Sequence, residues 1–226
     1  MSVLKYVFAT LILLSVHAEA TIIRVVNNAV APQTVNAIKV FYTGVVNQEK
    51  VMALASVIDE INQKYTSAKH IYLYISSTGG DVDSGNIGYQ LVKSSPIPVT
   101  TINVSFVQSS ATLMYCGAQN RLVMDNTEFL LHAPTVGTVI KNDVSENVIN
   151  DEHEWSATYR GMIKHIYKIC TNLSDDKIDK LTYSEDNHML LNSTAALNIK
   201  LATGEQKGIQ PTEASFYIYD GSKAVR

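Results

Sequence analysis

The chain has 226 residues, of which 46% are hydrophobic and 17% are charged, and its formal net charge is −3. This length is sufficient to bury one full hydrophobic core, and no low-complexity tract interrupts it, so we expect one domain. A mildly acidic chain without a basic run gives no reason to expect a nucleic-acid partner.

The first 20 residues predict a signal peptide. Lys5 precedes an apolar stretch at 7–16, and Ala18-Glu19-Ala20 has the small-x-small form of a signal peptidase site. The stretch is shorter than the roughly 20 apolar residues of a membrane-spanning helix. We therefore expect cleavage after residue 20, a mature domain over 21–226 without a stable membrane anchor, and a periplasmic or secreted location. An uncleaved anchor or a buried helix is the alternative.

The hydrophobic pattern predicts strands and helices that alternate along the chain. In chain order we expect a strand at 37–44, a helix at 51–65, a strand at 70–75, a helix around 85–92, a strand at 98–104, a helix at 110–118, short strands at 121–124 and 129–131, and a long helix at 143–171. This order favours an α/β sheet with crossover connections.

The long helix has a narrow apolar stripe, which needs a partner surface in the core or in another subunit. The stripe consists of Trp155, Tyr159, Met162, Ile166 and Ile169. No internal repeat or linker composition divides the chain.

The chain has two cysteines, Cys116 and Cys170. An oxidising compartment would allow them to form one disulfide. The apolar surroundings of Cys116 instead favour a free thiol in the core. The sequence leaves both states open.

Three short motifs suggest a serine hydrolase: Gly79-Gly80, Ser109-Ser110 and His132, each placed after or within a β-prone run. A serine hydroxyl needs a base that takes its proton, and the resulting oxyanion needs preorganised donors. We predict Ser109 as the nucleophile and His132 as the general base. We predict Gly79, Gly80 and Ser110 as the oxyanion donors. Taken singly, each motif also has a structural explanation. Gly79-Gly80 fits a turn, Ser109 fits a helix N-cap, and His132 fits a histidine buried in the core.

These motifs resemble the proteolytic subunit of the Clp protease, within the superfamily that includes the crotonases. Residues 71–82, Ile-Tyr-Leu-Tyr-Ile-Ser-Ser-Thr-Gly-Gly-Asp-Val, are similar to that family's Ile-Tyr-Leu-Tyr-Ile-Asn-Ser-Pro-Gly-Gly-Ser-Val. Residues 109–121 resemble its nucleophile helix, and residues 126–134 resemble its Asn-Ser-x-x-Met-Ile-His-x-Pro segment. The resemblance runs from about residue 38 to residue 203.

The resemblance implies an α/β fold of the Clp protease and crotonase type, with repeated β-β-α units and a long handle helix. It implies a peptidase with catalytic Ser109 and His132, which assembles into homo-oligomeric rings with the active sites inside. The helix that begins near Asp143 would be the handle that packs two rings together. No cofactor is expected, and a zinc site is not expected because His153 has no second histidine at helical ligand spacing.

The third member of the triad departs from the family pattern. Counting back from residues 192–196, which resemble the family's Ser-Ala-Pro-Glu-Ala, places the catalytic aspartate at Ser184. A serine cannot stabilise an imidazolium as a carboxylate does. We predict that nearby Asp186 completes a Ser-His-Asp triad, with Glu185 as the other carboxylate of this loop. The alternative is that both are solvated loop residues.

We therefore expect an exported serine endopeptidase that acts on short or unfolded peptides without an ATPase partner. Three alternatives remain open. A Ser-Lys dyad, which resembles that of signal peptide peptidases, would use Lys164 or Lys168 as the base. The loss of the acid at residue 184 would also fit a catalytically decayed ring scaffold or binding protein. Crotonase-like acyl-CoA chemistry would share the Gly-Gly donor but would not need Ser109 and His132 together.

Overall fold

A computed structural model describes residues 19–135 and 146–221. The apolar stretch at 7–16, on which the signal-peptide prediction depends, lies outside these residues. Residues 19 and 20 belong to the first strand. Among the helices of the described ranges, none is both long and apolar enough to cross a membrane.

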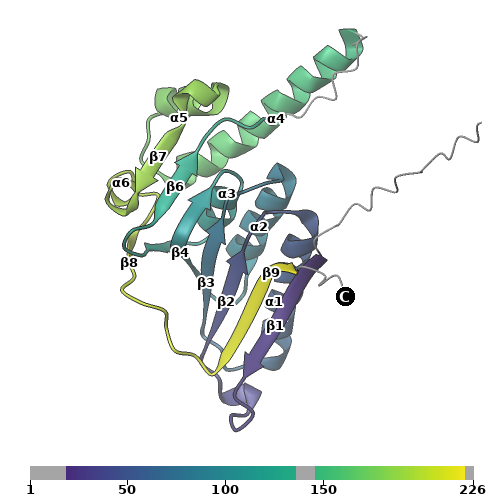
Figure 1. Cartoon of the computed structure of the whole chain (residues 1–226), viewed down its shortest axis with the longest axis vertical. Helices are drawn as coiled ribbons and strands as arrows, with labels where there is room; N and C mark the ends of the chain where they lie inside the picture. Colours follow the sequence, from purple (N-terminus) through teal and green to yellow (C-terminus); the bar gives the residue numbers. More distant parts are fainter. Residues whose placement is uncertain (1–18, 136–145, 222–226) are drawn as a thin grey trace, which may run out of the picture.

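Within the described residues, one nine-stranded sheet has the order β1-β9-β2-β3-β4-β5-β8, with β6 paired to β4 and β7 paired to β6 (Figure 1). The strands are β1 (Glu19–Val26), β2 (Ala37–Thr43), β3 (His70–Ser77), β4 (Val99–Gln108), β5 (Asn120–Val123), β6 (Glu128–Leu131), β7 (Met189–Asn192), β8 (Gly204–Glu205) and β9 (Ala214–Gly221). Pairing among β2, β3, β4, β5 and β6 is parallel. The predicted α/β sheet with crossover connections is therefore present.

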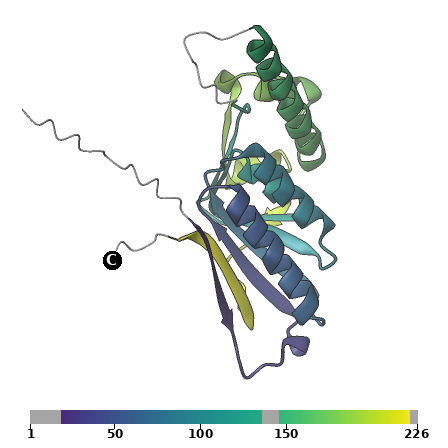
Figure 2. The ribbon, with the colours of Figure 1, turned by 90° about the vertical axis from the view of Figure 1, so that its right-hand side faces the viewer.

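The helices are α1 (Gln48–Lys64), α2 (Val82–Ser94), α3 (Ala111–Cys116), α4 (Glu146–Cys170), α5 (Asp175–Tyr183) and α6 (Ser193–Asn198). Two short 3-10 turns, η1 (Pro32–Thr34) and η2 (Glu185–Asn187), complete the elements. Figure 2 shows α1 and α2 side by side on one face of the sheet. This placement buries the apolar residues Val51, Leu54, Val57, Ile58 and Ile61 of α1.

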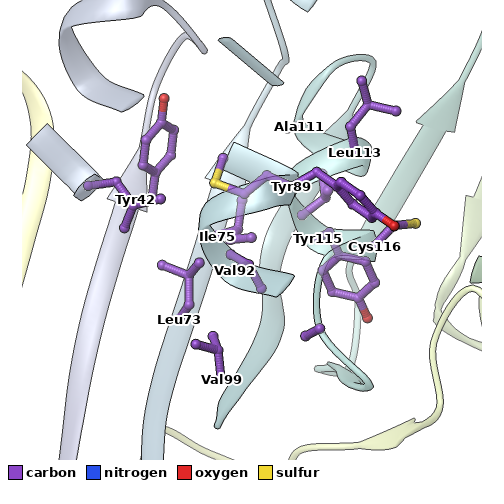
Figure 3. Packing of buried hydrophobic residues seen from close by; sticks show 14 of the residues in the cluster. Tyr42, Leu73, Ile75, Tyr89, Val92, Val99, Ala111, Leu113, Tyr115 and Cys116 are labelled. Carbon is purple, nitrogen blue, oxygen red and sulfur yellow. The ribbon is translucent and has the colours of Figure 1, made fainter. Parts of the chain in front are cut away.

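The core lies between this helical layer and the central strands. Figure 3 shows side chains of β3, α2 and α3 packed together, among them Ile75, Val92 and Tyr115. All three side chains are buried. Because α3 packs into this core directly after β4, the β4–α3 turn has a fixed position.

The apolar stripe predicted for the long helix is only partly buried. Ile166 is buried, but Trp155 and Ile169 are each 57% exposed. The buried residues of α4 are Ile163, Ile166, Tyr167 and Cys170. Only the C-terminal part of α4 packs against α3 and α5, and the N-terminal part extends away from the sheet (Figure 1). The predicted first residues of this helix, 143–145, lie outside the described residues.

The two cysteines form a disulfide, so the expectation of a free Cys116 thiol is wrong. Cys116 ends α3 and Cys170 ends α4, with their Cα atoms 5.5 Å apart. Both side chains are buried where the two helices pack together. The apolar surroundings of Cys116 were identified correctly, but they include the second cysteine.

Candidate active site

The Gly79-Gly80 turn joins β3 to α2 and lies against the β4–α3 turn. Gly79 has φ +84°, a backbone conformation that residues with a side chain rarely adopt. A Cβ at this position would also lie only 2.5 Å from the Cβ of Ser109. The N–H of Val46 donates to the Gly79 carbonyl at 2.8 Å, and the N–H of Asp81 donates to the Val46 carbonyl at 2.9 Å. Glycine is therefore required for the close approach, and the β2–α1 loop holds the turn in place.

Ser109 occupies the turn between β4 and α3 with φ +52°. This left-handed conformation is uncommon for a residue other than glycine and costs roughly 1–3 kcal/mol. The Ser109 N–H donates to the carbonyl of Leu130 in β6 at 2.8 Å, which fixes the turn to the neighbouring strand. Such strain is held in place by the surrounding structure and is frequent at functional sites.

The three predicted oxyanion donors differ in availability. The Gly79 N–H donates to the hydroxyl of Ser77 at 3.1 Å. Within the described ranges, the N–H groups of Gly80 and Ser110 donate no hydrogen bond to the protein. Gly80 and Ser110 are therefore the free donors, whereas Gly79 allows the close approach of the two turns.

His132 follows β6 and contacts a carboxylate. Its Nδ1 lies 2.7 Å from Oε1 of Glu185, the first residue of η2. The predicted partner, Asp186, is turned away, since its Oδ2 accepts a 3.3 Å hydrogen bond from the Ser184 hydroxyl. Ser184 also caps η2 by accepting from the Asp186 N–H at 3.3 Å. This capping places Glu185, and not Asp186, beside the imidazole.

Ser109 and His132 line the same small pocket, together with residues of α2, α3 and α4. No hydrogen bond joins their side chains in the part of the chain that the structure describes. Catalytic hydrogen bonds are often long in an unliganded enzyme and shorten in the substrate complex. The Ser109 hydroxyl and the His132 imidazole therefore line one pocket, but no direct hydrogen bond connects them in this structure.

The lysines considered for a Ser-Lys dyad are oriented elsewhere. Lys164 forms an ion pair with Asp179 at 2.6 Å, and Lys168 forms one with Asp175 at 2.9 Å. Both acidic partners belong to α5, and neither lysine lines the pocket of Ser109. The geometry therefore favours an imidazole base.

Two site residues carry no signal in the sequence motifs. Thr112 donates to the carbonyl of Ser109 at 2.6 Å and lies 2.8 Å from the hydroxyl of Tyr167. Because the single hydroxyl proton of Thr112 is used toward Ser109, Tyr167 is the donor of the second bond. Burial raises the pKa of Tyr167 to about 12, so it is a neutral donor at ordinary pH. Neither residue was predicted to belong to the site.

The described residues hold no cluster of three or more His, Cys, Asp or Glu side chains that could bind a metal ion. The candidate site contains the Ser109 hydroxyl, the His132–Glu185 pair and two backbone N–H groups that donate to no other described residue.

Comparison with known proteins identifies the family. The Clp protease family model matches residues 19–202. The ATP-dependent Clp protease proteolytic subunit 3 of Rhizobium etli is 35% identical over 101 residues, which cover 44% of this chain and 51% of that protein. The proteolytic subunit of Paracoccus denitrificans is 31% identical over 137 residues, covering 60% of this chain and 65% of that protein. The matched region thus spans between about half and two thirds of these relatives.

A solved structure supports the fold. A ClpP1 mutant from Listeria monocytogenes superposes with a TM-score of 0.64 at 19% identity, over 75% of this chain and 91% of that one. At this identity the similarity concerns the fold alone. It confirms the predicted α/β fold of the Clp protease and crotonase type. Since the family model covers most of the sequence, the chain belongs to the Clp protease family.

Proposed function

We propose that the chain is a serine endopeptidase with a Ser109-His132-Glu185 triad. The observation that carries this proposal is the 2.7 Å contact between His132 Nδ1 and Glu185, because His132 also lines the pocket of Ser109. A carboxylate on one imidazole nitrogen orients the ring and stabilises its protonated form, which leaves the other nitrogen to accept the serine proton.

In the first half of the reaction, Ser109 Oγ attacks the peptide carbonyl while His132 Nε2 takes the hydroxyl proton. The N–H groups of Gly80 and Ser110 donate to the oxyanion of the tetrahedral intermediate. The intermediate expels the amine, which receives the proton from His132, and an acyl-enzyme remains. Water then repeats the sequence: its proton passes to His132 and back to Ser109, and the carboxylic acid leaves.

The alternative of a decayed scaffold rests on the absence of an acid at Ser184. Glu185 supplies a carboxylate at the position where a working triad needs one. Active enzymes also keep strain at the nucleophile, and Ser109 retains its left-handed backbone. Both observations favour the peptidase over the scaffold.

We also propose export to an oxidising compartment, the periplasm or the cell exterior. The buried Cys116–Cys170 disulfide supports this location, because disulfides are rare in reducing compartments. There, the enzyme acts on short or unfolded peptides without an ATPase. Assembly into a homo-oligomeric ring is supported by the exposed apolar residues Val148, Ile149 and Trp155 on the projecting part of α4.

Fluorophosphonate labelling of residues 21–226 tests the activated serine. We expect labelling of the parent protein, and none in the Ser109→Ala and His132→Ala variants. Ser110→Ala is a matched control, because it removes the neighbouring hydroxyl but keeps the backbone N–H; it should still be labelled. Cleavage of an unfolded polypeptide by the protein alone, without added nucleotide, would agree with independence from an ATPase. A folded oligomer that takes no label would instead support the scaffold.

A further inference from the structure

The pocket beside Ser109 is very small, and its walls away from Ser109, Ser110 and His132 are formed mainly by apolar side chains. Its walls include Val82, Leu113, Ile163 and Tyr167, from three different helices. Its volume is about 10 Å³, which is space for about one water molecule. Apolar walls beside the proposed nucleophile suit a substrate side chain, and the volume of the pocket limits the size of that side chain.

Tyr167 of α4 forms one wall of this pocket. Its side chain is buried, and its hydroxyl is fixed by the 2.8 Å hydrogen bond to Thr112. Rotating the ring out of the pocket would break this bond inside the core, and an unpaired buried hydroxyl is costly. The ring is therefore a fixed wall.

The helix that carries Tyr167 is also fixed. Three residues after it, Cys170 forms the disulfide with Cys116 at the end of α3. The same short helix α3 contributes Leu113 to the pocket and Thr112 to the hydrogen bond with Tyr167. Separation of α3 from α4 would be needed to enlarge the pocket, and the covalent link and the hydrogen bond both oppose it.

We propose that this pocket receives the side chain of the residue immediately before the scissile bond, and that Tyr167 restricts it to glycine, alanine and serine. The inference rests on the proposed peptidase function. A leucine or phenylalanine at that position would have to displace buried side chains, and overpacking of this kind costs roughly 1–3 kcal/mol. The substrate class is therefore peptides rich in small residues.

The test compares two fluorogenic peptides that differ only in alanine or leucine before the cleaved bond. For the parent protein we expect kcat/KM to favour alanine by about 10- to 100-fold, the range for discrimination by pocket size. Tyr167→Leu and Ile163→Ala, each first checked for cooperative unfolding and fluorophosphonate labelling, should shift this ratio toward leucine. Tyr167→Phe is the matched control, because it keeps the ring and removes only the hydroxyl; the ratio should stay close to that of the parent.

The outcomes separate this inference from the proposed function. The inference is overturned if the labelled parent protein prefers leucine. It is also overturned if neither Tyr167→Leu nor Ile163→Ala changes the ratio of kcat/KM values. Both outcomes leave the proposed peptidase function intact. A folded oligomer that neither takes the label nor cleaves either peptide overturns both. If the enlarging variants unfold, inhibition of the parent by two peptide boronates with alanine or leucine at this position gives the same comparison, and tighter binding of the leucine compound overturns the inference.

Discussion

Glu185 Oε1 lies 2.7 Å from His132 Nδ1, although the two residues are 53 positions apart in the chain. The contact joins the end of β6 to the turn that follows α5. Glu185 therefore occupies the position beside the imidazole that the sequence predicts for Asp186.

The pair predicts a difference between two adjacent carboxylates. Glu185→Gln should lower kcat by about 10²-fold or more, because the neutral amide no longer stabilises the imidazolium; the corresponding change in a well-studied triad costs about 10⁴-fold. Because Glu185 is 53% exposed, we expect the smaller effect. Asp186→Asn should keep nearly full activity, because the side chain of Asp186 accepts a hydrogen bond from Ser184 and forms none with His132 in the described residues. Steady-state peptide hydrolysis by both variants measures this, and the reverse order would return the role to Asp186.

Much of the site could be predicted because its parts are local in sequence. A β-prone run followed by Gly79-Gly80, a serine at a strand-to-helix junction and a histidine at a strand end each have a recognisable pattern. The parallel pairing of β3, β4 and β6 then places these strand ends near one another. Which carboxylate lies beside His132 could not be obtained in this way, since it depends on how Ser184 caps the η2 turn. Counting back from residues 192–196 placed the acid at Ser184, and this count assumes that the η2 turn has the same length as in the family pattern.

Long-range pairings were also missed. β9 inserts between β1 and β2, and it lies beyond the residues that the family model matches. Its partners are 176 or more positions away in the chain, so no local pattern indicates them. The Cys116–Cys170 bridge is similar, because it depends on the packing of α3 against α4 rather than on the surroundings of either cysteine.

The left-handed backbone of Ser109, the proposed nucleophile, predicts that this residue lowers the stability of the fold. Ser109→Gly should raise the free energy of unfolding by about 1 kcal/mol, because glycine adopts φ +52° without the penalty of a Cβ. The same variant should take no fluorophosphonate label. Lys200→Gly is the matched control at φ +58°, distant from the pocket; it should gain similar stability and keep full labelling. Urea unfolding measures the stability, and a destabilised Ser109→Gly protein would contradict the account.

The disulfide should contribute strongly to stability. Its two cysteines are 54 positions apart, and closing a loop of this length stabilises the fold by about 4 kcal/mol on the chain-entropy estimate. The Cys116→Ala/Cys170→Ala variant should therefore unfold at a lower urea concentration than the oxidised parent. Reductant should weaken the parent to a similar degree and leave the variant unchanged. Thiol titration of the denatured, unreduced protein should find no free thiol, and two titratable thiols would contradict the bridge.

An ion pair between buried Lys50 and partly exposed Asp220 predicts unequal effects of its two partners. The Lys50 side chain is fully buried, with its Nζ 2.8 Å from Asp220 Oδ1 in β9. Asp220 also accepts from the N–H of Val45 at 3.3 Å, beside the residue that holds the glycine turn. Asp220→Asn leaves the ammonium buried without its counter-ion and should cost about 3 kcal/mol. Lys50→Met replaces the ammonium with an apolar group of similar length and should cost less.

The pH dependence distinguishes this explanation from a simple loss of packing. Burial lowers the pKa of Lys50 below its usual 10.5, although Asp220 opposes the shift. Removing Asp220 lowers this pKa further, so the unfolded chain binds more protons than the folded chain at pH values between the lowered pKa and 10.5. Stability rises with pH wherever the unfolded state binds more protons, and the penalty of Asp220→Asn should therefore shrink as pH rises toward 10.5. Lys50→Met should show no such recovery in urea unfolding at the same pH values. Equal slopes in the two variants would mean that Asp220 acts through its hydrogen bond to Val45 and not through the charge of Lys50.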